Sequence, residues 1–267
     1  MLELAWHLML RTDDDRVIAP GPAERRLLAR TVYRVADGAG LLAFGAADNH
    51  LHLVVLCSRE QAGRLAQQLA VALRGQLRIP VSFFPARIRE VRDQHHLRSV
   101  FHYVLGQRNH HGVRSDPFLD ASSLPELLGA RTLRTASMGL ARELLPREGR
   151  GQLVRHLAIP ALEPCCELVQ PVDAVAGALG LGDLDQHREL GLLGRAAVVE
   201  LCSPQLGNSE LSELLGRSAN TICRLRHLDV PPRLLHAARL QLAIRHYLAR
   251  HHPSVLEPHS LQLRRAS

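Results

Sequence analysis

The sequence predicts an α+β fold, an antiparallel sheet with packed helices, followed by an all-α domain with a helix-turn-helix. Three observations support this fold class. Strand-like and helix-like hydrophobic periods alternate over residues 1–107 in the order β, α, β, β, α, β, α. Eight of the nine aromatic residues lie within the first 118 residues. Beyond residue 186, apolar residues recur at the spacing of an α-helix. The chain therefore divides into an α+β part and a helical part.

The elements of the first part follow from hydrophobic period and from turn residues. We expect strands over Leu4–Leu10, Leu41–Phe44, His50–Leu56 and Ile79–Phe84, and helices over Pro22–Ala39, residues 60–76 and residues 93–107. The second and third strands join through a turn at Gly45–Asn49.

Charge and turn residues suggest where the domains end. Residues 1–120 carry a formal charge of +4, residues 121–185 carry −2, and residues 186–267 carry +5. The middle segment contains five prolines and a glycine-rich stretch, which favour short helices and connections. We therefore predict a first domain over 1–120, a linker with short helices over 121–185, and a helical domain over 186–250.

Composition narrows the class of protein. The 33 basic residues are all arginine, and two explanations stand: a GC-rich genome, or phosphate binding by guanidinium groups. The longest strongly apolar stretch, Leu51–Cys57, is far shorter than the roughly 20 residues of a membrane span. The N-terminus does not resemble a signal peptide, and the five cysteines show no C-x-x-C spacing. We expect a cytoplasmic protein with reduced thiols and no membrane partner.

Two histidines follow the turn, in the segment Asn49-His50-Leu51-His52-Leu53. On a strand His50 and His52 point to the same face, and two imidazoles so placed can share one divalent cation. The alternative is a pair of histidines that face solvent or are satisfied by neighbours. With 16 histidines in the chain, about one His-x-His is expected by chance, so the tripeptide needs support from its context.

The helix predicted over 93–107 supplies a second group of polar residues. Tyr103 lies at the edge of its apolar stripe, and Gln107 follows at i+4, next to it on the helix surface. Arg98, Arg108 and Arg114 lie nearby in the sequence, and we expect these three arginines to bind DNA. On the helix alone, Tyr103 is better explained as a half-buried boundary residue.

Together these segments resemble the single-tyrosine HUH transposases, in particular the REP-associated tyrosine transposase group. The stretches that carry the resemblance are AWHLMLRTDDDRVIA, DNHLHLVV and IREVRDQHHLRSVFHYVLGQRNHHGV, within residues 1 to about 120. The resemblance implies a ferredoxin-like HUH fold, with His50, His52 and Gln107 as ligands of Mg²⁺ or Mn²⁺ and Tyr103 as the nucleophile. It also implies single-stranded hairpin DNA as the substrate and a homodimer as the active assembly.

Two departures from the family pattern keep a second hypothesis open. Ala46-Ala47-Asp48 stands where the family usually has Met-Pro before the Asn-His, and Gln107-Arg108 stands where it commonly has Asn-Pro. Some members use Gln as this ligand. A domesticated transposase that binds a specific DNA sequence without cleaving it is therefore the alternative to an active transposase. A metal-dependent phosphoesterase with two histidine motifs is a weaker third candidate, because only one His-x-His occurs.

The chemistry explains why these residue types occur together. A divalent metal neutralises a phosphodiester oxygen, and a tyrosine phenol, a weak nucleophile at neutral pH, benefits from cationic neighbours. Attack gives a 5′-phosphotyrosine and a free 3′-hydroxyl, which store the bond energy for rejoining. Imidazoles favour transition metals, so Mn²⁺ agrees with both the ligands and the resemblance.

A second motif begins at Asn208, with the sequence NSELSELLGRSANTICRLRHL. We expect Asn208 or Ser209 to cap a helix with Leu211, Leu214 and Leu215 inward, Gly216 to form the turn, and Ser218 to cap a second helix. This spacing is typical of a helix-turn-helix and presents Asn220, Thr221 and Arg224 to the major groove of duplex DNA. An ordinary helical hairpin is the alternative.

Overall fold

The structure is a computed structural model, and it describes residues 5–107, 120–133, 136–185 and 188–253. The chain forms two compact units. Unit 1 comprises Met1–Leu128 and Arg134–Ala161, and unit 2 comprises Gly129–Leu133 and Leu162–Ser267. In the described part of the chain, no helix is long and apolar enough to span a membrane.

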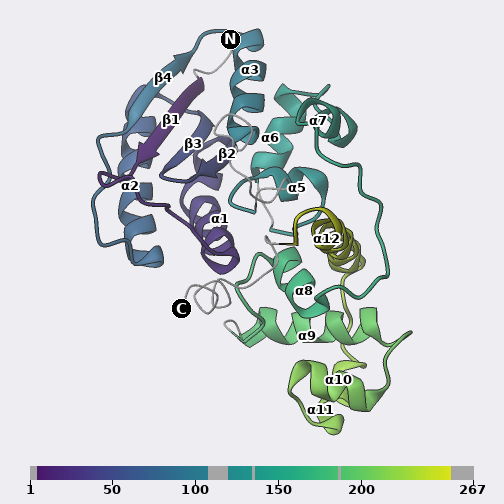
Figure 1. Ribbon diagram of the computed structural model, residues 1–267. Helices are drawn as coiled ribbons and strands as arrows, with labels where there is room; N and C mark the ends of the chain where they lie inside the picture. The colour runs from purple at the N-terminus through teal and green to yellow at the C-terminus, as the bar shows by residue number, and fades with distance from the viewer. Residues whose placement is uncertain (1–4, 108–119, 134–135, 186–187, 254–267) are drawn as a thin grey trace. The chain divides into compact units, whose positions relative to one another are not determined.

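Unit 1 contains a four-stranded antiparallel sheet, as the sequence predicts (Figure 1). Its first six elements are β1 (Ala5–Arg11), α1 (Pro22–Ala36), β2 (Leu41–Ala47), β3 (His50–Leu56), α2 (Arg59–Leu77) and β4 (Arg87–Val91). The strand order in the sheet is β2-β3-β1-β4, and every neighbouring pair is antiparallel. This βαββαβ arrangement is the ferredoxin-like, or split βαβ, topology.

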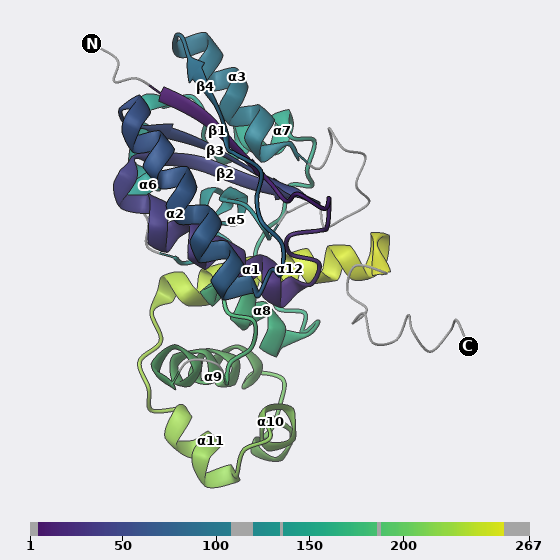
Figure 2. The same ribbon diagram turned by 90° about the vertical axis from the view of Figure 1, so that its left-hand side faces the viewer.

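The helices cover the two faces of this sheet unequally. Helices α1 and α2 pack against each other on one face, where α2 contacts β1, while α3 (Gln94–Leu105) contacts β2, β3 and β4 on the opposite face (Figures 1 and 2). Strand alternation places Leu51 and Leu53, both fully buried, on the face of α1 and α2. His50 and His52, which alternate with these leucines, therefore face α3.

The fourth strand is β4 over Arg87–Val91, so the strand expected over Ile79–Phe84 is wrong in position. Phe83 makes only an isolated bridge to Thr12. Pro80 and Pro85, on either side of Phe83, lack an N–H, so this segment can pair with β1 only over a few residues. The edge strand is instead a mostly exposed, arginine-rich segment, as edge strands commonly are.

The segment expected to be a linker, 121–185, is divided between the two units. Its first residues pair with the free edge of β2: Ala46 N–H donates to the Ala121 carbonyl (2.9 Å), and Ser123 N–H donates to the Phe44 carbonyl (3.0 Å). Helix α6 (Ala136–Leu144) also contacts β2. These long-range contacts place the segment with the sheet, which its prolines and charge did not indicate.

Three more short elements complete unit 1. They are the 3₁₀ helix η1 (Asp37–Ala39), α5 (Leu124–Leu128) and α7 (Arg150–His156). Gly40 ends η1 with φ +75°, and a Cβ at this position would lie 2.0 Å from the Leu56 carbonyl oxygen, so only glycine fits there.

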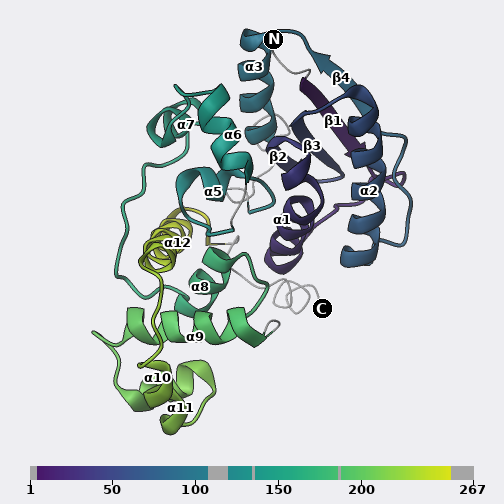
Figure 3. The same ribbon diagram turned by 180° about the vertical axis from the view of Figure 1, so that it is seen from behind.

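Unit 2 is helical in its described residues. It contains α8 (Pro171–Leu179), α9 (Arg188–Cys202), α10 (Asn208–Leu215), α11 (Ala219–Leu225) and α12 (Pro232–His251) (Figures 1 and 3). A core built mainly of Ala, Val and Leu joins all five helices, and the ion pair of Arg245 with Asp173 connects α12 to α8. The Gln241 amide donates to the Ala130 carbonyl (2.9 Å), which ties residues 129–133 to this unit.

Helices α10 and α11 form a hairpin with a three-residue turn. Helix α10 begins after Gly207, not after Asn208 or Ser209, and the Glu210 carboxylate accepts from the Gly207 N–H (2.7 Å). Gly216 ends it in the left-handed conformation (φ +59°), and Ser218 caps α11 as expected. Leu214 is exposed, contrary to the expectation that it faces inward, because Leu211 alone fills the buried position of this two-turn helix.

Candidate active site

His50 and His52 lie on the face of β3 that α3 covers. His52 pairs with Met9 on β1 and with Gly45 on β2, while His50 pairs with Arg11 and Ala47. The two ring centroids are 4.9 Å apart and the rings are nearly perpendicular. His52 is buried and His50 is half-buried at the end of the strand.

The residue before the strand orients His50. The Asn49 side-chain amide donates to Asp15 Oδ1 (2.8 Å), so its oxygen is directed to His50 Nδ1 at 2.6 Å. An amide oxygen only accepts, and His50 Nδ1 therefore carries the proton in this contact. The preceding Asp48 adopts φ +48°, in the two-residue turn between β2 and β3.

A third histidine, which the sequence analysis did not identify, completes the group. His7 on β1 lies with Nε2 2.9 Å from His52 Nδ1, and the two rings are stacked with centroids 5.1 Å apart. Burial, followed by the charges of Arg89 and His96, lowers the pKa of His7 from 6.5 to about 4. Strand alternation puts His7 on the face of the His-x-His, but the register between β1 and β3 is needed to see the contact.

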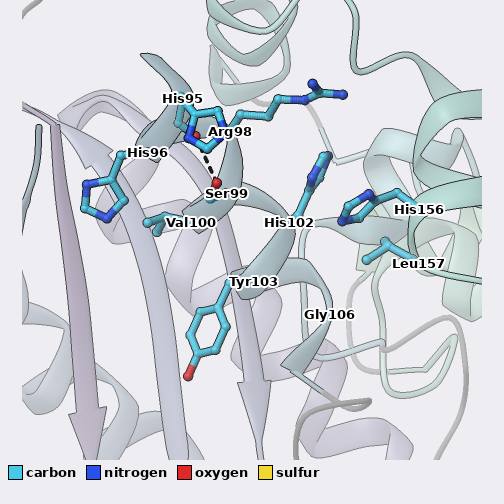
Figure 4. Close-up of a pocket in the computed structure, with 10 residues that line it drawn as sticks. All are labelled: His95, His96, Arg98, Ser99, Val100, His102, Tyr103, Gly106, His156 and Leu157. Atoms are coloured by element: carbon cyan, nitrogen blue, oxygen red, sulfur yellow. Dashed lines mark hydrogen bonds between the residues drawn. The ribbon is translucent and has the colours of Figure 1, made fainter. Parts of the chain in front are cut away.

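Tyr103 extends from α3 toward these histidines. Its ring centroid lies 5.5 Å from that of His52 and 5.8 Å from that of His7, in edge-on geometry. Tyr103 is half-buried, and in Figure 4 its side chain leaves α3 in a different direction from that of His102. The structure thus brings the predicted nucleophile and the predicted histidine couple together.

Gln107 follows immediately after α3, which ends at Leu105 with Gly106 as its C-cap. Its side-chain amide donates to the Tyr103 carbonyl (2.9 Å). The amide oxygen, Oε1, is buried and finds no hydrogen-bond donor among the described residues. A buried acceptor without a donor is costly, so this oxygen is suited to bind a cation.

Gly45 explains how the end of α3 reaches the histidines. A Cβ at Gly45 would lie 2.2 Å from the Val104 carbonyl oxygen and 3.8 Å from Gln107 Cγ. Because Gly45 is the register partner of His52, Gln107 lies over the same part of the sheet as His52. The glycine in the middle of β2 is the sequence feature that could have indicated this close approach.

We call His7, His50, His52, Tyr103 and Gln107 the sheet-side cluster. Two imidazoles and an amide oxygen are a donor set that fits Mn²⁺, since Mn²⁺ accepts both nitrogen and oxygen ligands. Ring centroids 4.9 Å apart agree with metal–nitrogen distances of about 2 Å to a shared ion. Among the described residues, no group of three or more His, Cys, Asp and Glu side chains is arranged to hold a metal.

A second polar group lies beside α3, and we call it the Glu148 cluster. The buried Glu148 carboxylate accepts from His102 Nε2 (2.6 Å) and from Arg98 Nε (2.5 Å), and His156 of α7 stacks on His102 with ring centroids 3.7 Å apart. Burial raises the pKa of the Glu148 carboxyl, but the hydrogen bonds from His102 and Arg98 outweigh it and hold the pKa below its usual value.

A pocket of about 710 Å³ extends along α3 from the Glu148 cluster to Tyr103 (Figure 4). Its lining includes His95, His96, Arg98, Tyr103 and His156. Arg98, predicted to bind DNA, is half-exposed here and keeps part of its guanidinium toward solvent while it pairs with Glu148. Two other arginines predicted to bind DNA, Arg108 and Arg114, lie outside the described residues.

The predicted duplex-binding residues lie on α11 in unit 2. Asn220 and Arg224 are exposed, and Thr221 is half-buried with its N–H bonded to the Ser218 cap. The neighbouring Arg226 is held by the Asn208 side-chain oxygen.

Comparison with known proteins gives only distant similarity. No family model matches the chain, and a search of curated proteins finds no match. Among solved structures, the chain is similar to one described as the REP-associated tyrosine transposase bound to a REP hairpin. The two share 12% sequence identity with a TM-score of 0.41, over 51% of this chain and 86% of that chain. The function of this chain therefore has to be inferred from its own residues.

Proposed function

We propose that the chain is a metal-dependent, transposase-like DNA strand transferase that cleaves and rejoins single-stranded DNA through a 5′-phosphotyrosine. The observation that carries this proposal is the convergence of the Tyr103 ring on the His50–His52 couple, with the buried Gln107 oxygen over the same part of the sheet. A nucleophile beside a set of neutral metal ligands is what phosphodiester transfer requires.

In the proposed reaction the Tyr103 hydroxyl oxygen attacks the scissile phosphorus. The new bond joins this oxygen to phosphorus, the bond from phosphorus to the 3′ oxygen breaks, and the leaving oxygen takes up a proton while the phenol loses one. The product is a 5′-phosphotyrosine with a free 3′-hydroxyl. Attack by a 3′-hydroxyl on the phosphotyrosine reverses these changes and rejoins a strand without an external energy source.

A divalent ion, Mn²⁺ or Mg²⁺, held by His50, His52 and Gln107 would neutralise a phosphate oxygen and orient the scissile phosphate. The half-buried Tyr103 lines an open pocket, so a DNA strand can approach it from solvent. Arg98 borders the same pocket and supplies a guanidinium to a neighbouring phosphate. We propose single-stranded hairpin DNA as the substrate and a homodimer as the active assembly.

The test of catalysis is a covalent adduct. A labelled single-stranded hairpin oligonucleotide from the DNA that flanks the gene, incubated with the protein and Mn²⁺, should give a protein–DNA adduct that survives a denaturing gel. Tyr103→Phe should abolish this adduct, because the nucleophilic oxygen is removed. Tyr247→Phe is the matched control, since Tyr247 lies on α12 in unit 2 and should leave the adduct unchanged. Equal adduct in wild type and Tyr103→Phe would refute the proposed nucleophile.

Helix α11 is proposed to add affinity for duplex DNA. Arg224→Ala should weaken duplex binding and lower the slope of log affinity against log salt by about 1, since one phosphate contact is lost. Arg239→Ala, an exposed arginine on α12, is the control and should leave both quantities unchanged. Duplex binding by Arg224→Ala with wild-type affinity and slope would assign this helix to packing alone.

The exposed Asn220 and Arg224 also support the second candidate, a domesticated protein that binds a specific duplex sequence without cleavage. The two candidates differ in the adduct experiment. The regulator predicts duplex binding that depends on Arg224 and no adduct with any hairpin, whereas the strand transferase predicts the adduct.

A further inference from the structure

The imidazole of His52 has its two nitrogens in different surroundings. Nδ1 lies 2.9 Å from His7 Nε2, and two nitrogens at this distance share one proton. If His52 donates, its Nε2 keeps a lone pair. If His7 donates, the single proton of a neutral His52 is on Nε2, and that nitrogen cannot bind a metal.

We propose that His7 is a positioning residue that accepts a hydrogen bond from His52 Nδ1–H and so fixes the tautomer in which His52 binds a divalent ion through Nε2. This inference rests on the proposed function, since it assigns a role to His7 toward the same ion. Metal-binding histidines commonly donate their second ring nitrogen to an acceptor, which fixes both tautomer and ring orientation.

The sheet register explains why His7 can do this. Met9 lies directly opposite His52, and His7 is two residues away on the same face, which makes it the diagonal neighbour of His52. Diagonal positions lie about 7 to 8 Å apart, within reach of two imidazole side chains. The contact is therefore set by the pairing of β1 with β3.

His50 shows the same arrangement with an unambiguous acceptor. Asn49 Oδ1 lies 2.6 Å from His50 Nδ1, and an amide oxygen only accepts. The proton is therefore on Nδ1 of His50, and Nε2 is the nitrogen that carries the lone pair. If His7 accepts from His52, both histidines of the couple use Nε2, and their Nδ1 atoms are both held by acceptors of the protein.

The geometry of the contact supports the role of acceptor. His7 is half-buried on β1, the strand that lies between β3 and β4 in the sheet. A neutral His7 has one nitrogen with a lone pair, and this nitrogen is Nε2 when His52 donates. The stacked geometry, with 23° between the ring planes, holds the two rings in this contact.

Two substitutions of His7 distinguish its role as a hydrogen-bond acceptor from a role in packing alone. His7→Phe keeps an aromatic ring that can stack on His52 but removes the acceptor, whereas His7→Gln keeps an acceptor oxygen in a side chain of similar reach. Thermal unfolding should show that His7→Phe folds, because a ring of similar size is placed in a half-buried position.

The first measurement is ¹⁵N–¹H correlation of the imidazoles in the metal-free protein, with His52 assigned by its loss in His52→Asn. Wild type and His7→Gln should show His52 protonated at Nδ1, and His7→Phe should shift His52 toward the Nε2-protonated form. The second measurement is Mn²⁺ binding by titration calorimetry, in which His7→Phe should weaken affinity about 10- to 100-fold and His7→Gln should retain most of it. A wild-type His52 protonated at Nε2, or full Mn²⁺ affinity in His7→Phe, would overturn the proposal.

Failure of the strand-transfer function has a different signature. In that case Mn²⁺ binds with the expected dependence on residue 7, but no covalent adduct forms on hairpin DNA. Neither measurement on His7 uses the cleavage reaction, so the tautomer and the ion affinity support or refute the role of His7 without it.

Discussion

The two polar clusters around α3 contain similar side chains but differ in one group. Each cluster stacks one histidine on another, at 5.1 Å for His7 and His52 and at 3.7 Å for His102 and His156. In the Glu148 cluster a buried carboxylate accepts from His102 and from Arg98. The sheet-side cluster includes an amide in place of a carboxylate. The adjacent residues His102 and Tyr103 of α3 therefore belong to different clusters.

This difference teaches what each cluster can bind. A carboxylate that accepts from both an imidazole and a guanidinium completes its own hydrogen bonds and charge, so the Glu148 carboxylate needs no cation. The sheet-side cluster combines lone-pair donors with no counter-charge of its own, and its buried Gln107 oxygen finds no donor among the described residues. The first cluster stabilises the contact of α3 with residues 148–156, whereas the second is suited to a cation.

The largest expected effect concerns stability. Glu148→Ala removes the acceptor of His102, whose side chain is 7% exposed, and leaves this polar group buried without its partner. Breaking a buried pair in this way costs about 3 kcal/mol of unfolding free energy. Urea denaturation at pH 7 measures this loss. Mn²⁺ affinity should not change, because Glu148 is not part of the sheet-side cluster.

The pH dependence of the same variant gives a second check. The Glu148 carboxyl has a lowered pKa in the folded protein, so its contribution is present above its unfolded value of 4.5 and is lost as pH falls through the folded value. The difference between wild type and Glu148→Ala should therefore shrink in acid. Glu143→Ala on the exposed surface of α6 is the control and should change stability little at either pH. A Glu148→Ala protein of wild-type stability that loses Mn²⁺ binding would reverse the roles of the two clusters.

The sequence predicted the fold better than it predicted the contacts between elements. Local hydrophobic period indicated the order of strands and helices, and the α+β class with an antiparallel sheet is confirmed. The fourth strand was misplaced because apolar Ile79–Phe84 outweighed the more polar segment that pairs with β1. The place of residues 120–128 was missed because it depends on distant partners, such as the pair of Arg26 with Asp120.

The candidate site shows the same limit. Alternation indicated that His50 and His52 share a face, and i, i+4 spacing indicated that Gln107 lies beside Tyr103. His7 and Glu148 were missed because their contacts join positions 45 or more residues apart. The hydrophobic period of a sequence shows which face of an element a residue lies on, but not how a strand is aligned with its neighbours. The contacts of His7 depend on that alignment, and those of Glu148 depend on tertiary packing.

A smaller effect, on Mn²⁺ affinity, is expected in the sheet-side cluster. Gln107→Glu introduces a carboxylate there, which is the group that distinguishes the two clusters. A carboxylate ligand adds a negative charge to a set of neutral donors, so Mn²⁺ should bind about tenfold more tightly, or about 1.4 kcal/mol. Gln107→Leu is the matched variant without an oxygen, and it should bind Mn²⁺ more weakly than wild type. Titration calorimetry of the three proteins measures the order of affinity. Equal affinity in all three would remove the amide from the ligand set and leave only the imidazoles to hold the ion. The close approach of α3 to Gly45 would then serve only to place Tyr103.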